Sequence, residues 1–257
     1  MRLLDHSCAT AEENLAFDEA LLDEAEAPRS PGAGQANDEV LRFWESPSLA
    51  VVLGRGCRAA YEVDLAACRR DRVPVLRRTS GGGTVLIGPG SLMYTLLLSK
   101  QSRPPLRAID SAHRAVLERH ATALSQLIPT VHAAGTSDLA VEVVVDTQQR
   151  VCKFSGNSLR VRRDWVLYHG TLLYDFPLDE LARYLRPPPR EPDYRQHRQH
   201  AEFVVNVPVS ASDLRRAIAA AWDASEPCDE ALQSRVAART EQLVADKYDR
   251  DDWNLQI

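Results

Sequence analysis

The feature that most constrains the fold is a run of three glycines between two apolar segments. It lies in Arg77-Arg78-Thr79-Ser80-Gly81-Gly82-Gly83-Thr84-Val85, after the apolar residues 73–76 and before the strand-like residues 92–98. Because glycine has no Cβ, a ligand can approach such a loop closely, and its N–H groups can form an anion-binding concavity. The two arginines add forked donors that suit phosphate or carboxylate. The segment therefore predicts an anion-binding loop between strands, with a plain hairpin carrying surface arginines as the alternative.

The loop does not follow the common nucleotide-binding patterns. No Gly-Lys-Ser/Thr follows at the spacing of a P-loop, and the glycines of the dinucleotide fingerprint are spaced, whereas these are consecutive. A second segment downstream adds weight to the first. It consists of Lys153-Phe154-Ser155-Gly156-Asn157-Ser158, followed by His169-Gly170-Thr171-Leu172-Leu173.

The composition excludes some classes of partner. The 257 residues carry a formal net charge of -5, which gives no electrostatic case for binding nucleic acid or an anionic membrane. An acidic partner would have to meet a local basic patch. The five cysteines are odd in number and form no Cys-x-x-Cys pair, which argues against a disulfide scaffold and favours a reducing, cytoplasmic location. We find no apolar run of membrane-spanning length and no apolar core of a secretory signal.

The periodicity of apolar residues predicts helices and strands. Thr10 and Glu13 form a capping-box pattern at the start of a helix over residues 11–25. Further helices are expected over residues 63–71, 109–127, 178–185, 212–223 and 229–247. Strands are expected over residues 40–44, 49–53, 93–98, 139–145, 151–161 and 165–174, the last three as an antiparallel meander. This pattern predicts a single α/β domain over residues 1–257, with irregular loops at 28–38 and 186–200.

Four histidines outside the second segment are not expected to bind metal. His113 and His120 have no Cys or carboxylate partner at metal spacing, so we expect them at the surface or edge of the helix over residues 109–127. His197 and His200 form a bare His-x-x-His within the proline-rich residues 186–200. Because prolines disfavour regular structure, that segment is expected to be a mobile, basic loop near the active site or a partner surface.

Together, the glycine loop and the downstream segments resemble the lipoate–protein ligase A and octanoyltransferase family. Members show an Arg-Arg-x-Ser/Thr-Gly-Gly-Gly-Ala/Thr-Val loop, a Lys-x-Ser/Ala-Gly-Asn/Ser-Ala element and a His-Gly-Thr/Ser-Leu-Leu strand. The resemblance extends over about residues 14–254, with the segments 28–38 and 186–200 outside it. It implies the class II synthetase-like catalytic domain shared by biotin and lipoate protein ligases, in which helices flank a mostly antiparallel sheet. Biotin ligases are less similar, because their Gly-Arg-Gly-Arg-x-Gly-Arg run is absent here.

The resemblance implies an activity and a set of site residues. The chain would activate lipoate, or a related medium-chain acid, with ATP and transfer the acyl group to a lysine. Lys153 would be the catalytic residue, and Asp138 would hold the Mg2+ that accompanies ATP, although Ser137 stands where the ligases usually have Asn. The implied substrate- and nucleotide-binding residues are Arg77, Arg78, Ser80, Gly81, Gly82, Gly83, Thr84, Ser155, Gly156, His169, Gly170 and Thr171. Candidates for an apolar acyl tunnel are Trp44, Val52, Leu86, Met93 and Leu172.

The resemblance also implies partners. The acceptors would be lipoyl carrier domains of 2-oxoacid dehydrogenases or the glycine cleavage H protein. The two-domain ligases have a small C-terminal accessory domain, whereas this sequence ends soon after residues that resemble the close of the large domain. We therefore expect a separate accessory polypeptide for adenylation, or an activity limited to transferring or binding a preformed acyl-adenylate.

Two other functions stay open at this point. Octanoyltransferases form a thioester on a cysteine, but residues 132–136 and 186–190, where branches of the family carry it, contain none here. Cys152 neighbours Lys153 on a strand, so its side chain should point to the opposite face, and we interpret it as structural. This favours acyl-adenylate chemistry over a thioester. The other alternative is a non-catalytic binder of lipoate or of a carrier protein that has kept the fold.

Overall fold

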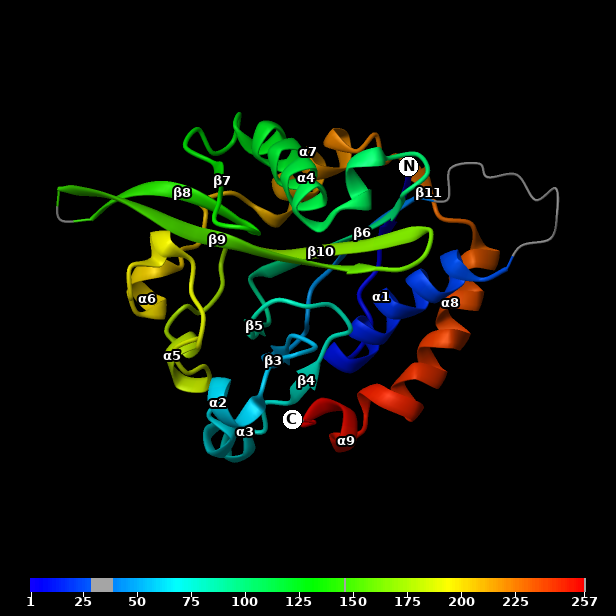
Figure 1. Cartoon of the computed structure of the whole chain (residues 1–257), viewed down its shortest axis with the longest axis horizontal. Helices are drawn as coiled ribbons and strands as arrows, with labels where there is room; N and C mark the ends of the chain where they lie inside the picture. Colours follow the sequence, from blue (N-terminus) through cyan, green and yellow to red (C-terminus); the bar gives the residue numbers. More distant parts are fainter. Residues whose placement is uncertain (29–38, 146, 257) are drawn as a thin grey trace.

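The computed structural model describes residues 1–28, 39–145 and 147–256, and an eight-stranded sheet forms its centre (Figure 1). From β2 to β7 each neighbouring pair is antiparallel, whereas β1 runs parallel to both of its neighbours. The order across the sheet is β11 (Glu226–Pro227), β1 (Arg2–Asp5), β2 (Val40–Trp44), β6 (Ser91–Ser99), β10 (Trp165–Leu173), β9 (Gln148–Val161), β8 (Asp138–Val145) and β7 (His132–Ala134).

Helices cover both faces of this sheet (Figure 1). α4 (Ile109–Leu124) and α7 (Ala211–Ala221) pack on one face, and α1 (Ala11–Glu26) and α8 (Glu230–Leu243) pack on the other. Side chains alternate along β10, because Val166 and Tyr168 belong to the core beneath α4 whereas Leu167 belongs to the core beneath α1. By the same alternation, His169 and Thr171 face the α1 side of the sheet.

A smaller sheet carries the glycine loop. Its strands are β4 (Val75–Arg77), β3 (Ala50–Leu53) and β5 (Val85–Ile87), with β3 parallel to β4 and antiparallel to β5. The loop over residues 78–84 joins β4 to β5; the sequence predicts a loop here after residues 73–76, but not the short strand β5. This sheet shares a third apolar core with short helices on its outer side, α2 (Ala59–Glu62), α3 (Leu65–Asp71) and α5 (Glu180–Tyr184).

The remaining helices are short. They are the 3₁₀ helices η1 (Pro104–Arg107) and η2 (Asp193–Arg195), the π-helix η3 (Val244–Tyr248), and α6 (His200–Phe203) and α9 (Asp251–Asn254). No helix in the described part of the chain combines the length and apolar character needed to cross a membrane.

Most predicted elements are confirmed, with differences at their ends. The capping box at the start of α1 is present, because the Thr10 hydroxyl accepts from the Glu13 N–H and the Glu13 carboxylate accepts from the Thr10 N–H. α4 ends at Leu124, three residues earlier than expected, since Leu127 N–H bonds to the Leu124 carbonyl in a tighter turn before Pro129. The apolar pattern extended the predicted helix to Leu127, although that side chain is exposed.

Two predictions about histidines on α4 are wrong. His113 and His120 were expected at the helix surface or edge, but both are buried, and His120 is 0% exposed. His120 Nε2 accepts a hydrogen bond of 2.8 Å from Trp222 Nε1, and His113 Nδ1 lies 3.1 Å from the Tyr168 hydroxyl. These partners come from the end of α7 and from β10, so the pattern of α4 alone could not reveal them.

The two predicted loops have different outcomes. Of the loop expected over residues 28–38, residues 29–38 lie outside the described residues. The segment over residues 186–200 is mostly irregular, as its prolines suggest. However, η2 follows directly after Pro192 and α6 begins at His200, so the segment contains more regular structure than expected. A proline before the first turn of a helix loses no helical hydrogen bond, which explains how η2 forms there.

Candidate active site

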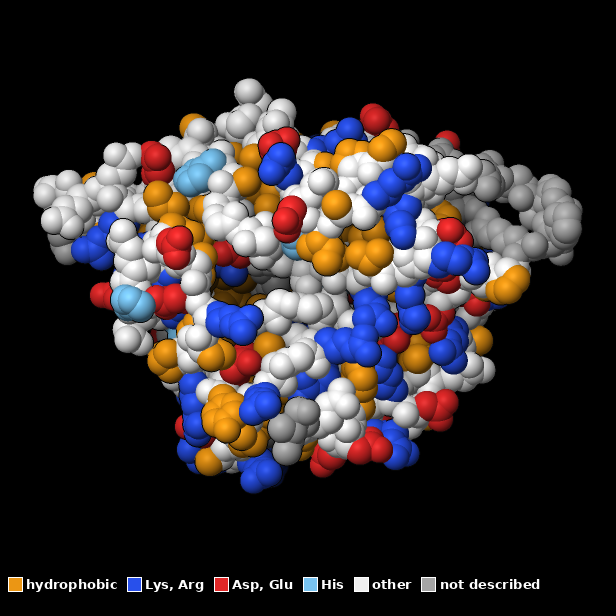
Figure 2. Space-filling view, viewed as in Figure 1, with side chains coloured by type: hydrophobic (Ala, Val, Ile, Leu, Met, Phe, Trp, Pro, Cys, Tyr) orange, Lys and Arg blue, Asp and Glu red, His pale blue; other side chains and the backbone are white. Residues whose placement is uncertain are grey.

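Two adjoining cavities lie where the glycine loop meets β9 and β10. The narrow cavity holds about 120 Å³, and the wide cavity holds about 410 Å³. Figure 2 shows the molecule hollowed on this face, beside the region of β5 in Figure 1. The residues that line both cavities, and so mark their junction, are Gly83, Thr84, Val85, Ser137, Lys153, Gly156 and Thr171.

The cavities differ in their walls. The narrow cavity is closed by apolar side chains from α1, β3, β5 and β6, which are Leu15, Val52, Val85, Ile87 and Met93. The wide cavity is bounded on its outer side by charged residues of the segment over 186–200, which are Arg186, Arg190, Glu191, Arg195 and His200. The narrow cavity therefore suits an apolar chain, and the wide cavity suits a larger, charged ligand.

Lys153 supplies an ammonium group at the junction of the cavities. Its Nζ lies 2.7 Å from Asp138 Oδ1, and Tyr194 donates a hydrogen bond of 2.8 Å to the other oxygen of that carboxylate. Burial, followed by the charge of Asp138, raises the pKa of Tyr194, which keeps its hydroxyl protonated as a donor. A Cβ on Gly156 would lie 2.7 Å from Lys153 Nζ, so glycine leaves the room that the amine occupies. The lysine is thus held in place but is still partly exposed to the cavity.

Arg78 supports the glycine loop from behind. Its guanidinium donates to the carbonyls of Gly81, Gly83 and Val52, and its Nε donates to Ser80 Oγ. Burial lowers the pKa of Arg78 to about 10, which still leaves it charged at neutral pH. With its donors directed at the backbone, Arg78 fixes the loop and places positive charge beneath it.

The loop also depends on close backbone contact. Gly82 has φ of +79°, in the left-handed region that favours glycine. A Cβ on Gly54 would lie only 1.9 Å from the Gly82 carbonyl oxygen, so the turn after β3 touches the loop directly. Ser158 Oγ donates to the Gly81 carbonyl at 2.8 Å from the other side. The loop is therefore clamped between β3 and β9.

Arg77 does not have the place that the sequence suggested. We expected it to meet phosphate, but it is 1% exposed and lines neither cavity. Its guanidinium donates to the carbonyls of Gly54, Cys57, Trp253 and neighbouring residues of these two segments. Arg77 is the last residue of β4 and Arg78 follows it; adjacent residues of extended chain point to opposite faces, so Arg78 faces the loop and Arg77 does not. Arg77 instead ties the end of the described chain to the small sheet.

His169 connects the loop to a buried ion pair. Its Nε2 lies 2.6 Å from Ser80 Oγ, and its Nδ1 faces Asp18 Oδ2 at 3.7 Å. Asp18 pairs with Arg42 at 2.6 Å, and it accepts a hydrogen bond of 2.7 Å from Thr95. The Ser80 hydroxyl accepts from Arg78 Nε and can donate to His169 Nε2; in that tautomer the ring proton lies on Nδ1, toward Asp18.

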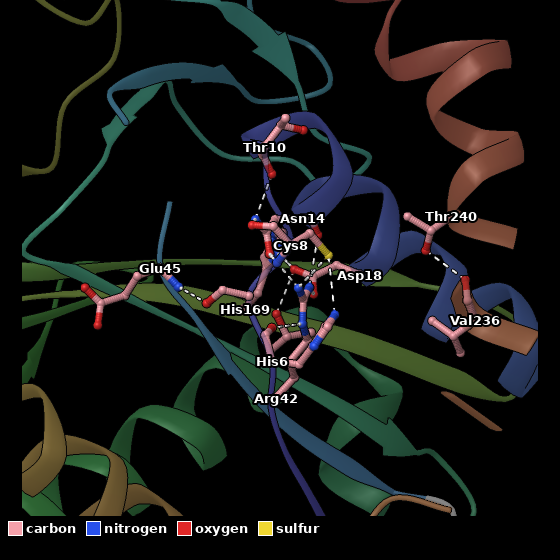
Figure 3. Close-up of polar contacts among 12 residues, drawn as sticks. His6, Cys8, Thr10, Asn14, Asp18, Arg42, Glu45, His169, Val236 and Thr240 are labelled. Atoms are coloured by element: carbon pink, nitrogen blue, oxygen red, sulfur yellow. Dashed lines mark hydrogen bonds and ion pairs between the residues drawn. The ribbon is translucent and has the colours of Figure 1, made fainter. Parts of the chain in front are cut away.

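The ion pair behind His169 lies in the interior between α1 and the central sheet (Figure 3). Arg42 is 0% exposed and donates to Asp18, to the Asn14 side chain and carbonyl, and to the His6 carbonyl. Burial alone would raise the pKa of Asp18, but the charge of Arg42, the neighbouring His169 ring and the hydrogen bond from Thr95 lower it. Asp18 therefore keeps its negative charge and can orient the imidazole.

Asn157 lies on β9 opposite Gly170 of β10. Its amide nitrogen donates hydrogen bonds to the Ser137 carbonyl, at 2.8 Å, and to Ser155 Oγ, at 3.2 Å. Its amide oxygen accepts a hydrogen bond from the Tyr94 hydroxyl. A Cβ on Gly170 would lie 1.9 Å from Asn157 Oδ1, so no side chain fits at that position. The close approach explains why β10 has a glycine at position 170, and Ser155 supplies an acceptor for the same amide.

The structure brings together most of the site residues that the sequence proposed. Those that line at least one cavity are Arg78, Gly82, Gly83, Thr84, Asp138, Lys153, Gly156, His169, Gly170 and Thr171. Ser80, Gly81 and Ser155 lie one contact behind the cavity walls, where they bond to His169, Ser158 and Asn157 respectively. Of the proposed acyl-tunnel residues, Val52 and Met93 line the narrow cavity and Leu86 lines the wide one, whereas Trp44 and Leu172 line neither.

Sequence reasoning missed several residues of the site. Leu15 lines the narrow cavity from α1, but its helical spacing marked it only as core. Asn157 and Ser158 also line that cavity, and their position directly after the Lys153 segment was an available signal. The pairing of Asp18 with Arg42 left no local signal, because 24 residues separate them in sequence.

The cysteines near the site do not face the cavities. Cys152 is buried, lines neither cavity and has its Sγ 3.6 Å from the Glu202 carbonyl. The Cys57 thiol donates a hydrogen bond to the Gly82 carbonyl, with Sγ 3.3 Å from the oxygen. Burial raises the pKa of this thiol, which disfavours the thiolate. The geometry agrees with the interpretation of Cys152 as structural, on the opposite side of β9 from Lys153.

The chain shares sequence with proteins of known family. Residues 10–220 match the lipoyl protein ligase A/B catalytic domain. A curated relative, the probable lipoate-protein ligase A of Mycoplasma pneumoniae, is 31% identical over 147 residues, which cover 57% of this chain and 40% of that protein. The matched region thus spans about two fifths of that relative's length.

Two solved structures share the fold over nearly the whole chain. One is from the archaeal lipoylation system of Thermoplasma acidophilum, described as a bi-partite lipoate protein ligase and its E2 lipoyl domain. It has a TM-score of 0.77 and 21% identity, covering 99% of this chain and 95% of that chain. The other is a lipoate-protein ligase A bound with ATP. It has a TM-score of 0.75 and 23% identity, covering 99% of this chain and 98% of that chain. They confirm the expected fold, and with the match over residues 10–220 the chain belongs to the lipoyl protein ligase A/B catalytic domain family.

Proposed function

We propose that this chain is a lipoate–protein ligase-like enzyme. It would activate lipoate, or a related medium-chain acid, as an acyl-adenylate and transfer the acyl group to a lysine of a lipoyl carrier domain. The observation that carries the proposal is the position of Lys153 Nζ, at the junction of an apolar cavity and a charged one, beside the glycine loop. Membership of the family supports the same activity.

The acyl chain would lie in the narrow cavity. Val52, Ile87 and Met93 offer it an apolar wall, and the carboxyl group would point to the junction, toward Lys153. His169 and Thr171 line this cavity as the nearest polar groups of β10. Since Asp18 fixes the orientation of His169, the ring would position the carboxyl without itself transferring a proton.

The nucleotide would lie in the wide cavity, with its α-phosphate at the junction. A carboxylate oxygen of the acid attacks the α-phosphorus and pyrophosphate leaves. In the second step the amine of the acceptor lysine attacks the acyl carbon, loses a proton, and AMP leaves. Lys153 would neutralise charge on the phosphate and on the acyl oxygen in both steps, and the loop N–H groups would add fixed dipoles. The bound ATP in the structural neighbour supports the choice of nucleotide.

Asp138 is the residue that would hold Mg2+. Magnesium in nucleotide sites commonly uses one or two carboxylates together with phosphate oxygens. Asp138 lines the wide cavity, and its carboxylate is shared between Lys153 and Tyr194 rather than enclosed by apolar atoms, so its surroundings fit this role. Bound magnesium would screen the negative charge of the phosphates.

The acceptors in this proposal are lipoyl carrier domains, such as those of 2-oxoacid dehydrogenases or the glycine cleavage H protein. The Thermoplasma neighbour is described together with its E2 lipoyl domain, which supports this class of acceptor. That neighbour is also described as bi-partite, so we propose that a separate accessory polypeptide assists the adenylation step. Transfer from preformed lipoyl-AMP would then need the present chain alone.

Replacement of Lys153 by alanine tests the proposal. With lipoyl-AMP and an apo E2 lipoyl domain, we expect Lys153→Ala to lower kcat/KM by about 10²- to 10³-fold, the usual cost of losing one transition-state donor. Lys100→Ala is the matched control, because Lys100 donates to two backbone carbonyls and lines neither cavity. Full activity in Lys153→Ala, or equal losses in both variants, would contradict the role assigned to Lys153.

A further inference from the structure

A group of arginines lies on the surface beside the glycine loop. It consists of Arg55 after β3, Arg160 and Arg162 at the end of β9, and Arg239 on α8, and we call these four residues the basic rim. Figure 2 shows Lys and Arg side chains gathered on this face, over the region that Figure 1 places at α1 and the loop between β4 and β5. For a chain with a net charge of -5, this is a local reversal of charge.

Electrostatic interactions join the members of the basic rim. Arg162 and Arg239 share the carboxylate of Asp23, at 3.3 and 2.9 Å. Burial, followed by the charges of Arg55 and Arg162, lowers the pKa of Arg160, so these three guanidinium groups act on one another. Like charges close to one another are unfavourable for the isolated chain, and the opposite charge of Glu19 offsets only part of their effect on Arg160. A cluster of this kind is more stable when a negative partner binds to it.

Two members of the basic rim have spare hydrogen-bonding capacity. Among the described residues, none accepts a hydrogen bond from the side chain of Arg55, which is exposed. The side chain of Arg160 is half-buried, and no described residue accepts a hydrogen bond from it; its buried Nε is among the donors left without an acceptor. Native proteins usually satisfy the donors of such side chains. The outer nitrogens of both arginines can therefore receive carboxylates.

The basic rim borders the site but does not enter it. Arg55 N–H bonds to the Ser80 carbonyl at 2.8 Å, which fixes Arg55 against the start of the glycine loop. Arg160 follows Ser158 by two residues on β9, so it shares the face on which Ser158 contacts Gly81. Neither arginine lines the narrow or the wide cavity. A ligand bound inside the cavities would thus leave the basic rim exposed.

We propose that the basic rim docks an acidic surface on the carrier domain that presents the acceptor lysine, an inference that rests on the proposed function. The acceptor must bring its lysine to the junction at Lys153 while the rest of the domain stays outside. A macromolecular surface can reach the rim and the cavity mouth together, whereas the nucleotide phosphates would stay at the junction. Arginines with unused donors suit bidentate pairing with carboxylates.

Charge reversal at two rim positions tests this docking. The donor is preformed lipoyl-AMP and the acceptor is an apo E2 lipoyl domain, so the measurement isolates acyl transfer. We expect Arg55→Glu combined with Arg160→Glu to raise the KM for the acceptor by about tenfold at low ionic strength, with kcat within about twofold. The difference should shrink at about 1 M salt, where the screening length falls to roughly 3 Å. Affinity for lipoyl-AMP should not change.

Two further variants keep the test decisive. Arg216→Glu is the matched control, because Arg216 is 76% exposed on α7, across the sheet from the basic rim, and should leave the KM unchanged. Arg55→Glu alone alters only an exposed side chain and should raise the KM by about threefold even if the double variant misfolds. An unchanged KM in a folded variant, or a loss confined to lipoyl-AMP affinity, would overturn the docking proposal while the proposed function stands. Absence of transfer by the wild-type chain would overturn both.

Discussion

The contact between Gly54 and the glycine loop gives the sharpest test of how the site is built. A Cβ at position 54 would lie 1.9 Å from the Gly82 carbonyl oxygen and 2.9 Å from its carbonyl carbon. Real Cβ atoms stay at least about 3.0 Å from such atoms, so Gly54→Ala must move the loop by about 1.1 Å. The loop cannot yield without loss, because Gly81 and Gly83 are bonded to Arg78 and Gly81 to Ser158.

The displacement predicts a loss of activity larger than the loss of stability. A shift of about 1 Å in a positioning group costs roughly 10²-fold in rate, whereas inserting one methyl group into a packed site costs about 1–3 kcal/mol in folding free energy. Gly56→Ala is the matched control, since a Cβ there meets nothing within 4 Å. Both variants change one glycine of the same turn by one methyl group.

The assay is acyl transfer from lipoyl-AMP, measured as kcat/KM, together with thermal unfolding. We expect kcat/KM of Gly54→Ala to fall by about 10²-fold, although the variant should still unfold cooperatively. The kcat/KM of Gly56→Ala should stay within about twofold of the wild-type value. If Gly54→Ala remained folded and kept kcat/KM within about twofold, the loop would not need its observed position, and the reasoning would be refuted.

Three further predictions concern the rest of the chain. Burial lowers the pKa of His120 to about 3, below its ordinary value of 6.5. As the pH drops from 6.5 toward 3, the imidazole of His120 is protonated in the unfolded chain but not in the folded chain, so the folded state loses stability. Chemical denaturation should show a loss of about 2 kcal/mol from this group between pH 7 and 5, absent in His120→Gln; equal slopes in both proteins would disprove it. Thr10→Ala removes half of the capping box and should lower the unfolding free energy by about 1 kcal/mol, measured by urea denaturation, and no change would contradict the cap. Cys152→Ser should transfer the acyl group at the wild-type rate, and a complete loss would favour a cysteine thioester instead.

Local chemistry explains why much of the fold was predictable. The capping box of Thr10 and Glu13 placed the start of α1 because its donors and acceptors lie within four residues. The alternating apolar residues of β8 and the turn after them predicted the meander, since strand pairing across a short loop depends on neighbouring sequence. The glycine loop and Lys153 were predicted together through family resemblance, because each has a local motif.

Other features depended on partners distant in sequence. Arg77 and Arg78 look alike in the sequence, but in the fold Arg77, at the end of β4, contacts the end of the described chain, whereas Arg78 lies beneath the loop. His120 was assigned to a helix surface because its acceptor role depends on Trp222, 102 residues away. The charges of the basic rim come from three separate elements, so no single stretch of sequence displays them together.

The sequence by itself determined the positions of the longer strands, the capped first helix and the glycine loop, and its resemblance to a known family indicated the amine that we propose acts beside that loop. The strands, the helix and the loop follow from backbone conformations and periodicities that each segment sets for itself. Tertiary structure alone decided which arginine supports the loop, which groups orient His169 and where the two cavities meet. The reason is physical: burial, pairing and pKa depend on which atoms from remote segments come within a few ångströms, and only the folded chain sets those distances.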